Sequence, residues 1–263
     1  MQLSNAQVLL TGASGGIGLA LCAALCQEGA KVLAVARNTQ VLQQISQQYP
    51  AQLQILPADL LNPADLMYVV EQATQKPDLN MLIHAAGLNH FALLEHQTAE
   101  QIQRLVQLNV TTPMLLTSAL MEKLKSQPQA KIVNVGSIYG SLGFAGYTTY
   151  CATKFAVRGF SEALRRELAD SAVQVLYVAP RATKTSMNST AAQQLMQAMG
   201  GKEDAPEFVA KMIVEAIKQD KQNIYLGWPE RGFVMINSIL PHLVDQGVRK
   251  HLPLIRQLSR AKG

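Results

Sequence analysis

Residues 7–18 read QVLLTGASGGIG, and the fold expected for the whole chain is built outward from this stretch. Its first five residues form an apolar run that ends at a glycine, which is typical of a short buried strand. The glycine-rich turn then leads into a helical pattern. Gly12 permits a tight turn, Gly16 lets the backbone approach a pyrophosphate, and Gly18 lets the helix pack on the strand. The N-terminus of that helix favours phosphates, so the stretch predicts a dinucleotide site rather than a plain turn.

Strand-like and helix-like segments alternate along the rest of the chain, without an internal repeat, a low-complexity segment or a linker. This alternation predicts a parallel sheet with helices on both faces. We expect one Rossmann-type α/β domain over residues 1–230, followed by a helical extension over residues 231–263. Further strands are expected at Lys31–Ala36, Gln52–Pro57, Asn80–His84, Lys131–Val135, Val173–Val178 and Asn223–Leu226, and helices at Leu19–Gln27, Asn38–Gln48, Pro63–Gln75, Ala99–Lys125, Ala152–Ala169 and Pro206–Lys218.

The composition allows a large buried core. The chain has 263 residues, of which 48% are hydrophobic and 16% are charged. No run of about 18 uncharged apolar residues predicts a spanning helix, and the first residues lack the pattern of a signal peptide. Cys22, Cys26 and Cys151 form no C-x-x-C pair, and no cluster of His, Cys and carboxylates has the spacing of a metal site. We therefore expect a cytoplasmic protein without a metal ion.

The net charge of +5 is concentrated at the C-terminal end. Residues 1–230 carry 17 Lys and Arg against 17 Asp and Glu, whereas residues 231–263 carry six Lys and Arg against Asp245 alone. A general nucleic-acid-binding protein would carry a basic face on its body. The charge distribution therefore argues against a nucleic-acid partner.

The end of the second strand indicates which dinucleotide is bound. Val35-Ala36-Arg37-Asn38 has no carboxylate that could bind the ribose hydroxyls of NAD, while Arg37 could pair with a 2′-phosphate. We therefore expect NADP, with a surface arginine as the alternative for Arg37. Asp59 follows the third strand, where it could accept a hydrogen bond from the adenine amino group or cap the next helix.

Tyr150 and Lys154 are four residues apart, which places their side chains on one face of a helix. A neighbouring ammonium favours the phenolate and is expected to lower the pKa of the tyrosine, which is ordinarily about 10. A tyrosine adjusted in this way can exchange a proton with a carbonyl oxygen near neutral pH. Ser137 follows a predicted strand, and its hydroxyl could hold the same oxygen. The pair alone is a weak motif, and a solvated lysine beside a packed tyrosine is the alternative.

Three further features are unusual for the segments in which they lie. Asn109 lies at the centre of a long helical stretch, where asparagine is a poor helix former, so a kink and a bound water are expected there. His84 ends a strand and is interpreted as a packing residue, because a single histidine has no catalytic role without a partner. Residues 188–205 are rich in Met and Gln and end in two glycines, which is typical of a mobile lid.

Five motifs in this order resemble the short-chain dehydrogenase/reductase family over about residues 5–228. The motifs are TGASGGIG, Asp59, the Ala-Ala-Gly turn at 85–87, Asn109, and Ser137 with Tyr150-Cys-Ala-Thr-Lys154. The resemblance implies a seven-stranded sheet of order 3-2-1-4-5-6-7. It also implies that the cofactor lies at the carboxyl ends of the strands, and that the protein is a homodimer or homotetramer formed through the helices in residues 99–125 and 152–169.

The resemblance also implies roles for individual residues. Tyr150 is the expected general acid/base, Lys154 adjusts its pKa and holds the nicotinamide ribose, Ser137 polarises the carbonyl, and Asn109 anchors a water in a proton relay. Thr185 is expected at the nicotinamide carboxamide. The full set of expected cofactor-binding residues is Gly12, Ser14, Gly16, Ile17, Gly18, Arg37, Asp59, Ala86, Gly87, Tyr150, Lys154, Pro180, Thr183 and Thr185.

The chain departs from the family pattern at three places. His84-Ala-Ala-Gly87 replaces the frequent Asn-Asn-Ala-Gly, and Thr183 replaces a hydrophobic residue. Pro180 is followed by Arg181 where the family often has glycine. Arg181 is expected either to reach a substrate carboxylate or phosphate, or to form a salt bridge at the rim of the site.

The helical extension over residues 231–263, called the tail below, also has two interpretations. It is rich in apolar residues between Phe233 and Leu258, with Pro241 and Pro253 as interruptions. One interpretation is a set of helices that cover the substrate cleft or a partner subunit. The other is a basic amphipathic surface that contacts an anionic membrane from its inner, cytoplasmic face.

These features together predict an NADP(H)-dependent oxidoreductase that interconverts a carbonyl and an alcohol. The lid and the tail favour an apolar substrate, such as a fatty-acyl chain, a steroid or another lipid-like carbonyl. The alternative is a non-catalytic NADP-binding sensor or structural protein on the same fold. Such a protein would be expected to have lost Tyr150 or Lys154, and both are present.

Overall fold

The computed structural model describes residues 1–259. Seven parallel strands form one sheet in the order β3-β2-β1-β4-β5-β6-β7, as expected from the resemblance. The strands are β1 (Gln7–Thr11), β2 (Lys31–Ala36), β3 (Leu53–Pro57), β4 (Leu79–His84), β5 (Ala130–Val135), β6 (Val173–Ala179) and β7 (Asn223–Tyr225). The order reverses between β1 and β4, which is where open α/β sheets bind their ligands.

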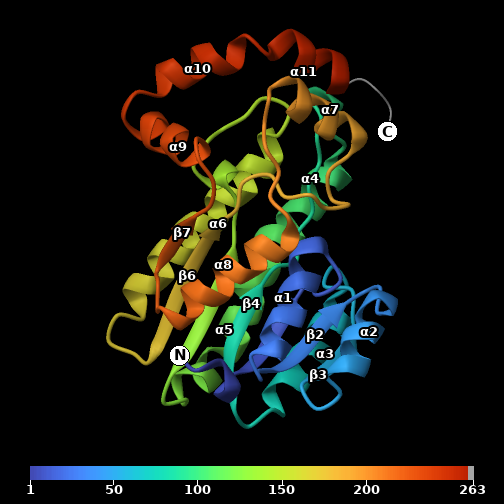
Figure 1. The fold of residues 1–263 in the computed structure, drawn as a ribbon, viewed down its shortest axis with the longest axis vertical. Coiled ribbons are helices and arrows are strands. Elements are labelled where there is room, and N and C mark those ends of the chain that lie inside the picture. The colour runs from blue at the N-terminus through green and yellow to red at the C-terminus, as the bar shows by residue number, and fades with distance from the viewer. Residues whose placement is uncertain (260–263) are drawn as a thin grey trace.

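Helices cover both faces of the sheet (Figure 1). Apolar residues of α1 (Gly16–Gln27), α2 (Gln43–Gln48) and α8 (Pro206–Lys218) pack in one core cluster. Those of α3 (Pro63–Thr74), α5 (Thr112–Lys125) and α6 (Thr148–Glu167) pack in the other. Strands buried on both sides explain why β1, β2 and β4 read as nearly continuous apolar runs.

The long helical stretch predicted at Ala99–Lys125 is interrupted, as expected, at Asn109. Here α4 (Ala99–Val106) passes through a π-helical segment, Gln107–Thr111, into α5. Asn109 is buried, and its side chain bonds to the backbone of Leu88 outside the helix. The extra residue in this turn aims that amide at its partner, in keeping with the frequent occurrence of π-bulges at functional sites.

The helix that carries Tyr150 begins earlier than the sequence pattern indicates. It was expected from Ala152, whereas α6 begins at Thr148. Its first bonds include the one from the amide of Cys151 to the carbonyl of Tyr147, at 2.7 Å. The side chains of Cys151, Thr153 and Lys154 are buried when this segment is helical. Their tertiary packing stabilises the first turn and outweighs the low helix propensity of Thr148 and Thr149.

Three tail helices lie beyond the carboxyl ends of the strands: α9 (Glu230–Ile239), α10 (Pro241–Arg249) and α11 (Leu252–Ser259). In Figure 1 they form a band across the end of the molecule, with α11 beside α7 (Thr190–Ala198) of the expected lid. The predicted extension reached residue 263, and its last four residues lie outside the described part. Within residues 1–259 no helix is both long and apolar enough to span a membrane.

Candidate active site

A pocket of about 810 Å³ opens at the carboxyl ends of the strands and extends from the glycine turn to α9. Every residue expected to bind the cofactor lines it, and so does Ser137. Asn109 alone of the predicted site residues does not line the pocket. The structure thus brings together, around one pocket, residues drawn from positions 12 to 185 of the chain.

The glycine turn packs against the neighbouring loop with no room for side chains. Gly12 has φ +69°, and a Cβ there would lie 2.6 Å from the backbone of Ala86. A Cβ on Gly18 would overlap the carbonyl oxygen of Gly12. The space in front of Gly16 is occupied by the side chain of Thr185, so the glycine turn and the residue expected at the nicotinamide are already in contact. The glycines let the backbone at the start of α1 lie close to the pocket, which suits a phosphate group.

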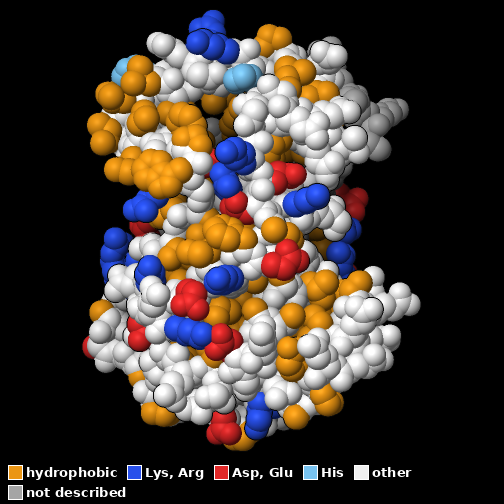
Figure 2. Space-filling view, viewed as in Figure 1, with side chains coloured by type: hydrophobic (Ala, Val, Ile, Leu, Met, Phe, Trp, Pro, Cys, Tyr) orange, Lys and Arg blue, Asp and Glu red, His pale blue; other side chains and the backbone are white. Residues whose placement is uncertain are grey.

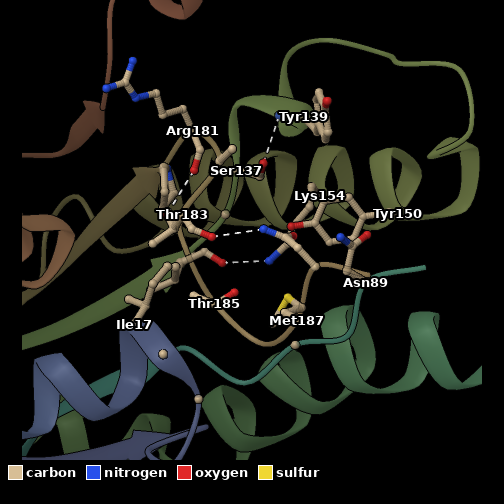
Figure 3. Close-up of a pocket in the computed structure, with 18 of the residues that line it drawn as sticks. Ile17, Asn89, Ser137, Tyr139, Tyr150, Lys154, Arg181, Thr183, Thr185 and Met187 are labelled. Carbon is tan, nitrogen blue, oxygen red and sulfur yellow. Dashed lines mark hydrogen bonds between the residues drawn. The ribbon is translucent and has the colours of Figure 1, made fainter. Parts of the chain in front are cut away.

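Ser137, Tyr150 and Lys154 converge in the same pocket (Figure 3). Ser137 follows β5, while Tyr150 and Lys154 lie one turn apart on α6. The Lys154 ammonium is buried and donates to the carbonyl of Val135 at 3.0 Å. It lies 5.6 Å from the centroid of the Tyr150 ring. An ammonium has three N–H donors, and the pocket beside it is where the remaining donors can be used.

Burial dominates the electrostatics of this pair. It raises the pKa of Tyr150 well above its ordinary value, while the hydroxyl of Ser137 acts in the opposite direction. Burial also lowers the pKa of Lys154 to about 8. The expectation that Lys154 holds the pKa of Tyr150 below its ordinary value is therefore wrong for the protein alone. The low polarity of the pocket disfavours both charges, so Tyr150 is held as a protonated acid.

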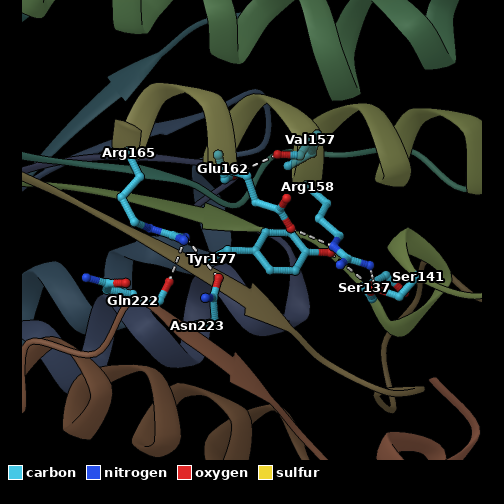
Figure 4. Close-up of polar contacts among 10 residues, drawn as sticks. Ser137, Ser141, Val157, Arg158, Glu162, Arg165, Tyr177, Gln222 and Asn223 are labelled. Atoms are coloured by element: carbon cyan, nitrogen blue, oxygen red, sulfur yellow. Dashed lines mark hydrogen bonds and ion pairs between the residues drawn. The ribbon is translucent and has the colours of Figure 1, made fainter. Parts of the chain in front are cut away.

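A buried tyrosine fixes the position of Ser137. The hydroxyl of Tyr177 on β6 donates to the carbonyl of Ser137 at 3.1 Å (Figure 4). Gly136 and Gly140 on either side make room for the ring, since a Cβ at either position would overlap Tyr177. Because a buried hydroxyl is costly to leave unpaired, this bond defines where the turn after β5 must lie.

The same region holds an ion pair on α6. Arg158 donates to Glu162 at 2.9 Å and to the hydroxyl of Ser141 at 2.7 Å (Figure 4). Ser141 closes the short turn that begins at Ser137. The segment carrying Ser137 is thus attached to α6 as well as to β6.

Asn109 acts on the backbone rather than on the pocket. Its oxygen accepts from the amide of Leu88 at 2.7 Å, and its nitrogen donates to the carbonyl of Leu88 at 2.9 Å and to the hydroxyl of Thr153 at 3.0 Å. The residue therefore joins the loop after β4 to α6, directly behind Lys154. The helix is interrupted at Asn109 by the π-helical segment, while the expected kink and relay water stay predictions.

The surroundings of His84 and Asp59 bear on the roles expected for these two residues. The ring of His84 bonds Thr117 at 3.0 Å inside the core, and burial lowers its pKa to about 4, which supports a packing role. Asp59 accepts from the amide of Leu61 at 3.1 Å while lining the pocket. The N-cap of α3 is Asn62, so Asp59 does not cap that helix.

Arg181 forms the salt bridge that was one of its two expected roles. It binds Asp204 through two bonds of 2.6 and 3.0 Å, and Glu230 at the start of α9 at 3.3 Å. Residues 182–203, the segment between the paired residues, contain α7. The arginine therefore holds both ends of the lid segment and the tail together.

The sequence analysis did not identify the aromatic part of the pocket. Tyr139, Phe144 and Tyr147 form an aromatic cluster against Tyr150, with Tyr139 edge-on to it at 6.4 Å between ring centroids. Asn89 lines the same pocket, and its side-chain oxygen is buried without a hydrogen-bond partner. Its place two residues after the Ala-Ala-Gly turn is a signal that could have identified it.

The pocket suits a dinucleotide on these observations. The glycine turn at the start of α1, Arg37 after β2 and the buried Lys154 all line this pocket. Within the described residues no group of three or more His, Cys, Asp or Glu could hold a metal ion. Fold and site together define the class of dinucleotide-binding α/β oxidoreductases.

Comparison with known proteins narrows this class. The family model for short chain dehydrogenases matches residues 6–196, and the chain belongs to this family. The chain is 30% identical over 188 residues to the 3-oxoacyl-[acyl-carrier-protein] reductase FabG of Escherichia coli, covering 71% of this chain and 77% of that protein.

Solved structures extend the similarity to the tail. A short-chain dehydrogenase from Sphingobium yanoikuyae in complex with NADPH is 26% identical, with a TM-score of 0.77 over 93% of this chain and 95% of that chain. A short chain dehydrogenase/reductase from Burkholderia phymatum in complex with NAD has a TM-score of 0.82 at 19% identity, covering 93% and 96%, and shows the fold alone.

The contact between Gly18 and Gly12 can be tested with a pair of variants in one turn. Gly18→Ala should lower the melting temperature and abolish stabilisation by NADPH, because the added methyl group overlaps the Gly12 carbonyl. Gly15→Ala should keep the melting temperature of the protein without NADPH, since its Cβ would lie at 3.4 Å from the same oxygen. Thermal unfolding with and without NADPH measures the two effects. Equal behaviour of the two variants would contradict the assigned packing.

Proposed function

We propose that this protein is an NADP(H)-dependent reductase that interconverts a carbonyl and an alcohol, with Tyr150 as the general acid/base. The observation that carries the proposal is the convergence of Ser137, Tyr150 and Lys154 in a pocket that the glycine turn also lines. When bound, NADPH supplies the hydride for the reduction. The remaining tasks fall to side chains of this chain.

The geometry supports a division of labour among these side chains. The hydroxyls of Ser137 and Tyr150 hold the carbonyl oxygen, and Tyr150 donates its proton to that oxygen as the alcohol forms. Lys154 uses its free N–H donors on the cofactor ribose, and its positive charge then favours the phenolate left behind. Burial keeps Tyr150 protonated before the reaction, which is the state that a reduction requires.

NADP is favoured over NAD because of Arg37. Its guanidinium lies at the pocket end next to the glycine turn, and the sequence places no carboxylate at the end of β2. A 2′-phosphate can form charge-assisted bonds with such a group. The NADPH complex of the Sphingobium relative agrees with this preference, while the NAD complex of the Burkholderia structure shows that the fold itself accepts either nucleotide.

An apolar substrate fits the other half of the pocket. Aromatic side chains pack against Tyr150. Met187 and three apolar residues of the lid, Leu195, Met196 and Met199, line the same pocket. Flexible methionines adapt to chains of differing shape. We infer a lipid-like carbonyl, with a fatty-acyl compound as the leading candidate, in line with the 3-oxoacyl reductase activity for which the FabG relative is named.

We also propose that the protein forms a homodimer or homotetramer through α4, α5 and α6. Exposed apolar side chains mark this face: Val106, Met114, Leu115 and Phe155. Free, buried cysteines agree with a cytoplasmic location for the assembly.

Replacing Tyr150 tests the assigned acid. Tyr150→Phe should lower kcat for carbonyl reduction by about a thousandfold, because general acid catalysis is lost while the ring remains. NADPH should still raise its melting temperature. Tyr68→Phe, an exposed tyrosine on α3, is the control and should keep full activity. Equal rates for the wild type and Tyr150→Phe would refute the role, and stabilisation by NADPH without turnover of any carbonyl would favour a cofactor sensor.

The cofactor preference rests on one side chain. Arg37→Ser should raise KM for NADPH by about tenfold or more, the cost of about one charge-assisted bond, and leave KM for NADH nearly unchanged. Lys221→Ser, which removes an exposed charge remote from the pocket, serves as the control. An equal rise in KM for NADPH and NADH would show that Arg37 does not bind the 2′-phosphate.

The proposed assembly can be tested by light scattering after size exclusion. Leu115→Glu should convert the wild-type oligomer to smaller species, because it introduces a charge into the apolar face of α5. Met67→Glu alters an exposed methionine on α3 and should leave the mass unchanged. A monomeric wild type would rule out the proposal.

A further inference from the structure

The inner side of the tail is fixed to the core beside the active site. Ile255 of α11 is fully buried and lies against the segment around Gly146. Asn237 of α9 donates to the carbonyl of Ser141 at 3.1 Å, in the turn that carries Ser137. Arg181 binds Glu230 at the start of α9. The tail thus covers the substrate end of the pocket, which was one of its two expected roles.

The outer side of the same helices is apolar and uncovered. Between residues 228 and 243, seven large apolar side chains are exposed, and we call this set the tail apolar face: Trp228, Phe233, Met235, Ile236, Ile239, Leu240 and Leu243. Ile239 is 75% exposed and Trp228 69%. In Figure 2 hydrophobic side chains gather where Figure 1 places α9. Contiguous apolar exposure of this kind marks an interaction surface.

Positive charge lies along the same tail segment as this face. Arg231, Arg249, Lys250 and Arg256 are exposed, and none of them forms an ion pair within residues 1–259. Glu230, the acidic residue nearest the start of α9, is already paired with Arg181. Over residues 1–230 the formal charges balance, so the basic end of the chain coincides with its uncovered apolar face.

We propose that the tail apolar face binds the surface of an anionic membrane. Short amphipathic helices with large apolar side chains beside Arg and Lys lie in the plane of such an interface. Tryptophan prefers the headgroup level, which suits Trp228 at the edge of the face. A second copy of this chain is a poorer occupant, because a two-fold contact would bring the same unpaired cations of both copies together.

The face continues into the mouth of the pocket. Trp228, Pro229, Glu230 and Phe233 line the pocket, and Trp228 and Phe233 also belong to the tail apolar face. A chain bound in this orientation turns its pocket entrance to the lipid, so an apolar carbonyl enters from the bilayer without crossing water. This role as an entrance rests on the proposed function, whereas binding to the membrane does not.

Vesicle binding of the full chain tests the proposal. Wild-type protein should sediment with vesicles of phosphatidylcholine and phosphatidylglycerol, and bind much less to phosphatidylcholine alone. The double variant Ile239→Glu/Leu243→Glu should bind anionic vesicles about tenfold more weakly or worse, because two buried contacts with lipid are lost. Met67→Glu/Tyr68→Glu adds the same charges on α3 and should bind like the wild type. Arg249→Glu/Lys250→Glu should remove the preference for anionic lipid.

A second measurement needs no variant. Trp228 is the only tryptophan of the chain, so its fluorescence reports on the face directly. Brominated lipid in anionic vesicles should quench it. Wild-type protein that stays in the supernatant, or whose tryptophan is not quenched, would overturn the proposal. So would a tail variant that binds vesicles normally, or one that changes the oligomeric mass instead, since the face would then contact a second copy.

Measurements of activity test the proposed entry of substrate from the bilayer separately from the binding of the protein to the membrane. Ile239→Glu/Leu243→Glu should reduce a water-soluble carbonyl as fast as the wild type, and a long-chain carbonyl held in anionic vesicles more slowly. Equal rates on the vesicle-held carbonyl would overturn the entrance. Vesicle binding by a wild type that reduces no carbonyl would leave the surface in place and refute the proposed function.

Discussion

The buried contact between the Lys154 ammonium and the Val135 carbonyl is the interaction on which the site depends. It joins α6 to the end of β5 at the point where Tyr150 and Ser137 face one another. An ammonium loses much of its hydration on burial, so it must find acceptors where it lies. Asn109 holds the loop behind it, and Tyr177 holds the turn in front of it. The arrangement of the site therefore exists in the protein alone.

The parts of the fold that were predictable from the sequence are those set by local pattern. Apolar strands, the glycine turn and the Tyr-x-x-x-Lys spacing each reflect a rule that acts over a few residues. The strand order came from the resemblance and was confirmed. The interruption at Asn109 was predictable because a polar residue in an apolar helix face needs a partner.

The rest depends on contacts between distant segments. The early start of α6 is decided by burial of Cys151, Thr153 and Lys154, which no local propensity shows. The pKa of Tyr150 depends on how much low-polarity surface surrounds it, and Tyr139 and Tyr147 come from outside α6. Arg181 had two possible partners in the sequence, and only the fold places Asp204 and Glu230 beside it.

The ion pairs of Arg181 also limit how the pocket can open. The segment between Ala182 and Glu203 is held at both stems by one guanidinium, which also anchors α9. An outward movement of the whole lid segment would have to break the bonds of Arg181 to Asp204 and Glu230 at the same time. A movement of α7 alone, with both ends of the lid segment held, costs less free energy, since most of that helix is half-buried or exposed. We therefore expect ligands to enter and leave when α7 in the middle of the lid segment moves, while the two ends of that segment stay in place.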